Sequence, residues 1–216
     1  AIQAAHVEVL RDAFAGRGIR NTDLRLNPPA PHLGGRLWQA TFSVDGGRRA
    51  GAAGDGLLLS RTQPRDDGHD LHEVQVPIVE AYLAALPRGV APRVLASRTA
   101  VVVDADRREE VWAGADAGIR RLARTFLQRN ADGDLRDLAA LTNTHLGTVD
   151  DVVASLQNDR TLELATDVAF QVHSVDPVHE VTLRSIELLA TEVAPQLGLR
   201  TGAEAADELR ALGTAA

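Results

Sequence analysis

The sequence predicts an α/β domain built on a parallel sheet. Short apolar runs alternate with longer segments in which apolar residues recur at helical spacing, the pattern of repeated β–α units. The run at residues 100–103 is apolar throughout, as expected for a strand covered by helices on both faces. With 216 residues, 44% of them hydrophobic, the chain is long enough to form one domain around its own core.

The first part of the chain predicts two strands and three helices. Val7, Leu10 and Phe14 are spaced as on one face of a helix, and glycines after them indicate its end. A long connection rich in Pro, Gly and Asn follows, and such loops in compact domains are often functional. In chain order we expect a helix at residues 1–15, a loop at 21–35, a strand at 37–42, a short helix at 46–53, a strand at 56–60, a charged loop at 63–70 and a helix at 74–86.

The second part predicts two further strands and three helices. Residues 93–106 are rich in β-formers and lead into a helix at 106–128, and a strand is expected at 167–173. Thr148 is suited to cap a helix over residues 147–156, with Asp151 completing a capping box. Asp176 is the predicted N-cap of the last helix, with Pro177 at its first position. The apolar face of this helix is expected to carry Val181, Ile186, Leu189 and Val193.

Composition excludes several classes of function. The net charge of −7 and the 3% aromatic content disfavour nucleic-acid binding, which calls for a basic face and stacking rings. The absence of cysteine excludes disulfides and thiolate chemistry and is compatible with a reducing compartment. No apolar run approaches the ~20 residues of a membrane helix, so we expect a cytoplasmic protein. The absence of Met, even at position 1, indicates a processed chain or a piece of a longer one.

The stretch QATFSVDGGRRAGAAGDGLLLS at residues 39–60 is the strongest candidate for a binding site. A strand that ends near Phe42 and a helix that opens at Gly46 and Gly47 would leave several backbone N–H groups without partners. These donors and the positive end of the helix dipole suit a phosphate, and Ser43 adds a hydroxyl. Asp45 opposes this interpretation unless its side chain turns outward. The alternative is that the glycines only let the helix pack closely, which is also the interpretation for Gly51, Gly54 and Gly56.

Polar residues follow two other predicted strands. His173 ends one strand, and Ser60 with Arg61 follows another; the carboxyl ends of parallel strands are where ligands bind in such folds. His173 is a candidate acid, base or ligand contact, and Arg61 a candidate partner for an anionic group. A hydrogen-bonded structural histidine and a surface arginine are the alternatives. His69, His72 and His179 have no partner carboxylate at a metal-site spacing, so no metal is expected.

Four segments resemble, in order, the bacterial-luciferase-like flavin-dependent monooxygenases. The stretch at 39–60 is similar to a strand, turn, Ala-rich helix and strand of that family; the other three segments are VAPRVLASRTAVVVDAD, GTVDDVV and TDVAFQVHSVDPVHEVTLRSIELLATEVAPQL. The resemblance implies a (β/α)₈ barrel of the TIM type, of which residues 1–197 would form about the second half, strands five to eight, with a tail at 198–216. A whole barrel takes ~250 residues.

The resemblance also implies a cofactor and an activity. It places the phosphate of FMN, or of the deazaflavin F420, on the turn formed by Thr41, Phe42, Ser43, Val44 and Gly46. The implied activity is oxidation of a small organic substrate by reduced FMN and oxygen, with a separate flavin reductase as partner and a homodimer as the expected assembly. Ser60, Arg61 and His173 would line the substrate pocket. The alternatives are a non-catalytic flavin- or phospholigand-binding protein and a structural subunit that completes a barrel.

Overall fold

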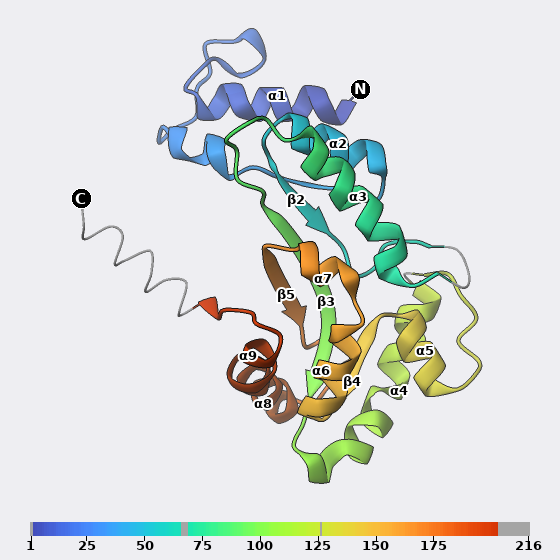
Figure 1. The fold of residues 1–216 in the computed structure, drawn as a ribbon. Helices are drawn as coiled ribbons and strands as arrows, with labels where there is room; N and C mark the ends of the chain where they lie inside the picture. The colour runs from blue at the N-terminus through green and yellow to red at the C-terminus, as the bar shows by residue number, and fades with distance from the viewer. Residues whose placement is uncertain (1, 66–68, 126, 203–216) are drawn as a thin grey trace.

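The computed structural model describes residues 2–65, 69–125 and 127–202, and within these ranges the chain forms one open, parallel, five-stranded sheet flanked by helices (Figure 1). The predicted α/β class is therefore confirmed at this level. The strands are β1 (Trp38–Ala40), β2 (Gly56–Leu59), β3 (Val94–Val102), β4 (Thr144–Gly147) and β5 (Asp167–Gln171). All four pairings between them are parallel, so their carboxyl ends point the same way.

The long strand β3 organises the sheet. Its residues Leu95 and Ala96 pair with both β2 and β5, so these two strands lie on opposite sides of β3. Thr99 pairs with both β4 and β5, so β4 continues on the side where β2 ends. Within the described residues, β5 pairs with β3 and not with β4, its predecessor along the chain. The correspondence to the second half of a barrel stays a prediction.

Strand β4 is absent from the sequence prediction, which expected four strands. Its sequence, Thr144–Gly147, is short and half polar, and it directly precedes the capping box of the next helix. A run of four residues with Thr and His in it shows neither clear alternation nor a continuous apolar stretch. Only pairing with residues 99–102 of β3 makes it a strand.

Helices cover both faces of the sheet, and their order agrees with the expected alternation. The described helices are α1 (Ile2–Phe14), α2 (Val44–Ala52), α3 (Leu71–Ala85), α4 (Arg108–Thr125), α5 (Leu135–Leu141), α6 (Val149–Gln157), α7 (Arg160–Leu164), α8 (His179–Leu188), the π-helical turn η4 (Leu189–Val193) and α9 (Ala194–Gln196). Short 3₁₀ turns lie at Ile19–Asn21, Pro31–Arg36 and Ala105–Arg107. None of the described helices is long and apolar enough to cross a membrane.

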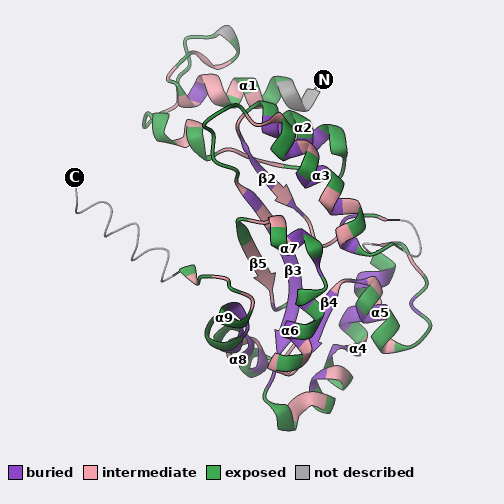
Figure 2. Cartoon of the chain, viewed as in Figure 1, coloured by how far each residue is buried: buried purple, intermediate pink, exposed green. Residues whose placement is uncertain are grey.

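The core divides into three clusters because neighbouring residues of β3 point to opposite faces. Ala100 and Val102 pack against α6 and α8, whereas Val101 packs with Leu146 of β4 against α4 and α5. At the other end of the sheet, the third cluster joins β2 and the start of β3 to α3. Figure 2 shows the resulting line of buried residues along β3 and β4, with exposed residues on the outer surfaces of the helices.

One face of the sheet is incompletely covered near β2. Leu58 and Leu95 are register partners and lie on the face opposite Leu57 and Leu59, because side chains alternate along a strand. Leu57 and Leu59 are fully buried against α3, whereas Leu58 and Leu95 are half-buried and belong to none of the three core clusters. This apolar surface lies at the end of the sheet where β1 has a single partner strand.

The start of the last long helix differs from the prediction. Helix α8 begins at His179 with Val178 as N-cap, and Asp176 has a left-handed φ of 54° instead of the extended backbone of a cap. Its carboxylate forms an ion pair with Arg121 of α4, which holds the turn against that helix. Ile186, expected on the apolar face, is 50% exposed. By contrast, the capping box of Thr148 and Asp151 at the start of α6 is confirmed.

Candidate ligand site at the carboxyl ends of the strands

The turn between β1 and α2 brings two hydroxyls to the start of a helix. Ser43 is the N-cap of α2, and its Oγ accepts a hydrogen bond from the Gly46 N–H at 3.2 Å. Thr41 Oγ1 accepts from the Ser43 N–H at 3.2 Å and lies 3.4 Å from Ser43 Oγ. Because β1 ends at Ala40, both hydroxyls lie at the carboxyl end of the sheet.

The glycines of α2 are required for close packing, as one interpretation of the sequence proposed. A Cβ on Gly46 would lie 1.8 Å from Thr41 Oγ1, so only glycine at this position lets the Thr41 side chain pack against the first turn of α2. A Cβ on Gly47 would lie 2.5 Å from the carbonyl oxygen of Ile78, and one on Gly51 2.2 Å from that of Tyr82. Helix α2 therefore packs backbone to backbone against α3. Gly46 makes room for Thr41 in the β1–α2 turn, and Gly47 and Gly51 allow the close contact between α2 and α3.

The turn is exposed and retains unused donors. Phe42 and Val44 are 54% and 40% exposed. The N–H groups of Val44 and Asp45 have no hydrogen-bond acceptor among the described residues, as is usual in the first turn of a helix. The Asp45 carboxylate is ion-paired with Arg48, one turn along the same helix. The charge that opposed anion binding is thus compensated locally.

The next strand places Ser60 and Arg61 beside this turn. Ala40 is the register partner of Leu58, so the chain leaves β1 after Ala40 and β2 after Leu59 at neighbouring positions. The Ser60 hydroxyl accepts from the Thr62 N–H at 3.2 Å and lies 3.0 Å from the Thr62 hydroxyl. Ser60 is accordingly occupied in shaping its own turn.

Arg61 is a partly buried cation, and its hydrogen-bond partner among the described residues, Gln171, is neutral. Its Nε donates to Gln171 Oε1 at 2.9 Å, and no carboxylate of the described residues forms an ion pair with it. Burial lowers the pKa of Arg61 from its ordinary value, although a guanidinium remains protonated at neutral pH. A partly buried guanidinium without an acidic partner has lost hydration that no countercharge replaces, so binding of an anion beside it is favourable.

His173 forms no hydrogen bond to these groups. It follows β5 and is exposed, and its side chain has no hydrogen-bond partner among the described residues. Its carbonyl oxygen accepts from the Asp176 N–H at 3.1 Å and so closes the turn before α8. Gln171 of the same strand, which the sequence did not single out, contacts Arg61 instead.

A buried polar cluster beneath the sheet escaped prediction. Arg98 of β3 is fully buried and donates to Asp159 at 2.5 Å, to the Gln75 side chain at 2.9 Å and to the Ser97 carbonyl at 2.7 Å. The Asp159 carboxylate also accepts from the Thr161 N–H at 3.0 Å as the N-cap of α7. The signal was an arginine within a strand that is otherwise almost wholly buried, because such a charge needs an acidic partner.

His145 lies beside this cluster and is held neutral. Burial lowers its pKa from 6.5 to about 4, and the charge of Arg98 acts in the same direction. Its Nδ1 lies 2.8 Å from the Ser155 hydroxyl, while its Nε2 is buried without a hydrogen-bond partner. The described residues contain no group of three or more side chains that could hold a metal ion.

Comparison with solved structures shows what the fold resembles. The chain matches no protein-family model and no curated protein. It is 18% identical to apo-MsnO8 over 92% of this chain and 60% of that one, with a TM-score of 0.60. Against the monooxygenase RslO1 from Streptomyces bottropensis the identity is 21% over 89% and 60% of the two chains, again with a TM-score of 0.60.

A third neighbour carries a flavin. It is the oxygenating constituent of 3,6-diketocamphane monooxygenase of Pseudomonas putida, a type II Baeyer–Villiger monooxygenase in complex with FMN. The identity is 19% over 85% of this chain and 55% of that one, with a TM-score of 0.50. At these identities the likeness shows the fold alone, and the chain spans about 60% of the length of the first two neighbours. The chain thus shares the α/β fold of these proteins over part of their length.

Proposed function

We propose that the turn at residues 41–46 binds the phosphate of FMN and that the chain acts in a flavin-dependent monooxygenase of the luciferase-like class. The observation that carries this is the gathering of the Thr41 and Ser43 hydroxyls with the unused N–H groups of Val44 and Asp45 at the start of α2. Helix N-termini with free N–H groups are established anion sites. These groups match the phosphate of the cofactor, and they say nothing of its ring system.

Two further observations support the proposal. Arg61 leaves the sheet beside the turn with no acidic partner among the described residues, which favours an anionic ligand nearby. The fold is like that of two named monooxygenases, one of them in complex with FMN, which favours FMN over F420.

In this proposal the residues of the chain bind and orient, and the cofactor carries the redox chemistry. The hydroxyls of Thr41 and Ser43 would donate hydrogen bonds to phosphate oxygens, and the N–H groups of Val44 and Asp45 would add two backbone donors. A reduced flavin supplies electrons for the reaction of oxygen with a small organic substrate. A separate flavin reductase as electron source, a homodimer and a cytoplasmic location are parts of the same proposal. Ser60, Arg61 and His173 remain the proposed contacts to substrate.

Titration of FMN against the purified chain, followed by flavin fluorescence, tests the phosphate site. Riboflavin, which lacks the phosphate, is the matched ligand. Ser43→Ala removes one hydroxyl from the proposed site; Thr148→Ala removes the equivalent N-cap from α6 and is the control. We expect FMN to bind more tightly than riboflavin, and Ser43→Ala to abolish most of that difference while Thr148→Ala preserves it. Equal binding of the two ligands, or equal effects of the two variants, contradicts the proposal.

A specific observation also favours the structural-subunit alternative. Among the described residues, β1, β4 and β5 each pair with a single strand, and Leu58 and Leu95 are only half-buried. The chain also spans only about 60% of the length of its first two structural neighbours. A partner that supplies further strands would cover this surface. The mass in solution of the chain, co-expressed with the products of the adjacent genes, distinguishes the two functions. A complex of two different chains supports the structural-subunit alternative. NADH and oxygen consumption by the chain with an added flavin reductase supports the enzyme.

A further inference from the structure

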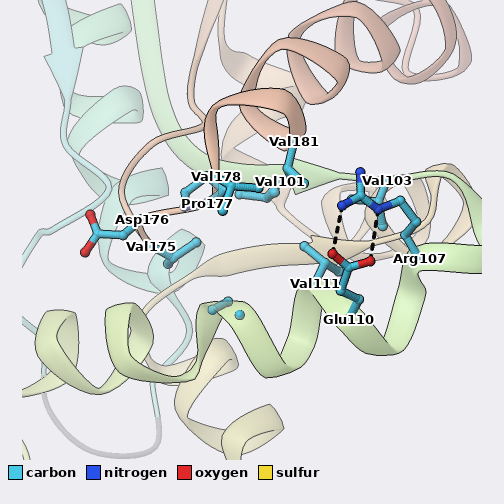
Figure 3. Close-up of a pocket in the computed structure, with 12 residues that line it drawn as sticks. Val101, Val103, Arg107, Glu110, Val111, Val175, Asp176, Pro177, Val178 and Val181 are labelled. Atoms are coloured by element: carbon cyan, nitrogen blue, oxygen red, sulfur yellow. Dashed lines mark hydrogen bonds and ion pairs between the residues drawn. The ribbon is translucent and has the colours of Figure 1, made fainter.

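We propose that the chain binds a small, neutral, apolar molecule in a cavity between the end of β3, the first turns of α4 and the segment that precedes α8. The volume of this cavity is about 140 Å³. Figure 3 shows the lining side chains, which lie between the helix that carries Val111 and the loop that carries Val175 and Pro177. This site is separate from the turn at residues 41–46, and the proposal holds whether or not a flavin binds there.

The floor of the cavity is built from hydrocarbon. Six of its residues are at least nine-tenths buried, and all are Val or Ala: Val101, Val103, Val111, Ala115, Val175 and Val181. Their side chains carry no hydrogen-bonding atoms, whereas a buried water needs two to four polar partners. Occupation by ordered water is therefore unfavourable at the floor, and an apolar occupant gains contacts that water cannot make.

The volume sets the size of the ligand. An engineered apolar cavity of about 150 Å³ stays dry and admits benzene. The cavity beside β3 is nearly as large, so a single hydrocarbon ring or a short branched chain matches it. Larger molecules would have to extend past the rim into solvent.

The charges at the rim are paired with one another, which favours a neutral ligand. Arg107 donates to both carboxylate oxygens of Glu110, at 2.8 and 3.1 Å, and also contacts Glu180 at 3.2 Å. Figure 3 shows the Arg107–Glu110 pair at one side of the valines, with the Asp176 carboxylate turned away from them. Asp176 is itself paired with Arg121. An ion entering the cavity would find no free countercharge among these groups.

Gly114 is a lining residue of the cavity at the protein surface. This residue is exposed on α4 and lines the cavity, and a Cβ built on it would meet no atom within 4 Å. A larger side chain at position 114 therefore has room to occupy part of the cavity without disturbing the helix. Ala113, its neighbour on the same helix, is also exposed but does not line the cavity, so it provides a matched control position.

The test uses fluorobenzene as the probe and ¹⁹F NMR of the purified chain as the readout, with benzoate as the charged analogue. We expect saturable binding of fluorobenzene, at least tenfold weaker binding in Gly114→Leu, unchanged binding in Ala113→Leu and no binding of benzoate. If Gly114→Leu does not fold, Ala115→Val, which adds two methyl groups to a buried lining residue, should weaken fluorobenzene binding in the same way. The proposal is overturned if the folded chain shows no saturable binding, if both position-113 and position-114 variants bind equally, or if benzoate binds more tightly.

Discussion

Arg61 and Gln171 form a hydrogen bond across β3, with Nε of Arg61 donating to Oε1 of Gln171 at 2.9 Å. The two residues are 110 positions apart and belong to the ends of β2 and β5, which flank β3 on opposite sides. This bond is the direct side-chain link between a proposed ligand-binding residue and the far side of the sheet. It fixes the guanidinium near the carboxyl ends of three strands.

A double-mutant cycle of Arg61→Ala and Gln171→Ala should reveal this coupling. We expect an interaction energy of about 0.5–1.5 kcal/mol, because the bond is charge-assisted but partly exposed. Urea denaturation of the four proteins measures it. Strict additivity would mean that the two side chains do not interact in solution and that Arg61 is free to turn elsewhere.

Gly51 and Gly114 should respond to alanine in opposite directions. A Cβ at Gly51 lies 2.2 Å from the Tyr82 carbonyl oxygen, so Gly51→Ala must separate α2 from α3 and should destabilise by about 1–3 kcal/mol. Gly114→Ala meets nothing within 4 Å and should stabilise by up to about 1 kcal/mol, because alanine has the higher helix propensity. Thermal unfolding of both variants measures the two signs. Stabilisation by Gly51→Ala would contradict the close helix pair.

Removing the carboxylate of Asp159 should destabilise the protein strongly. Asp159→Asn leaves Arg98 fully buried without its counterion, and the loss expected for such a broken pair is about 3–5 kcal/mol. The double variant Arg98→Met with Asp159→Asn removes the uncompensated charge and should recover part of that loss. Chemical denaturation of the single and double variants checks the order. If the double variant is no more stable than Asp159→Asn, the loss of stability does not come from the unpaired charge of Arg98.

The stability of the protein should fall between pH 6.5 and about pH 4 because of His145. Burial lowers the pKa of this histidine to about 4 in the folded chain, against 6.5 for an unperturbed histidine. As pH falls, the unfolded chain takes up the proton first, so the contribution of neutral His145 is complete above pH 6.5 and is lost toward pH 4. The slope from one such proton reaches about 1.4 kcal/mol per pH unit.

Denaturation midpoints across this pH range, compared with those of His145→Gln, measure that contribution. The variant should show a flatter profile, whereas His173→Gln, at an exposed position, should keep the slope of the parent chain. An unchanged profile in His145→Gln would assign the acid sensitivity to other groups.

The sequence alone determined the local structure of this protein. Helical periodicity and cap residues located α1, α2, α3, α4 and α6, and the capping box of Thr148 and Asp151 was predictable because its two hydrogen bonds join residues three positions apart. Near-continuous apolar runs located β2 and β3, because a strand that is covered on both faces has apolar residues at consecutive positions. The turn between β1 and α2 was also expected, but the helix was predicted to begin at Gly46, whereas α2 begins at Val44 with Ser43 as its N-cap.

Only the tertiary structure decided which distant residues meet. The short strand β4 exists through pairing with β3, the salt bridge of Arg98 joins positions 61 residues apart, and Gln171 rather than His173 contacts Arg61. The cavity beside β3 likewise depends on how α4 and the segment before α8 pack together. Each of these features arises from contacts between segments far apart in the chain, and such contacts leave no periodic pattern in either segment by itself.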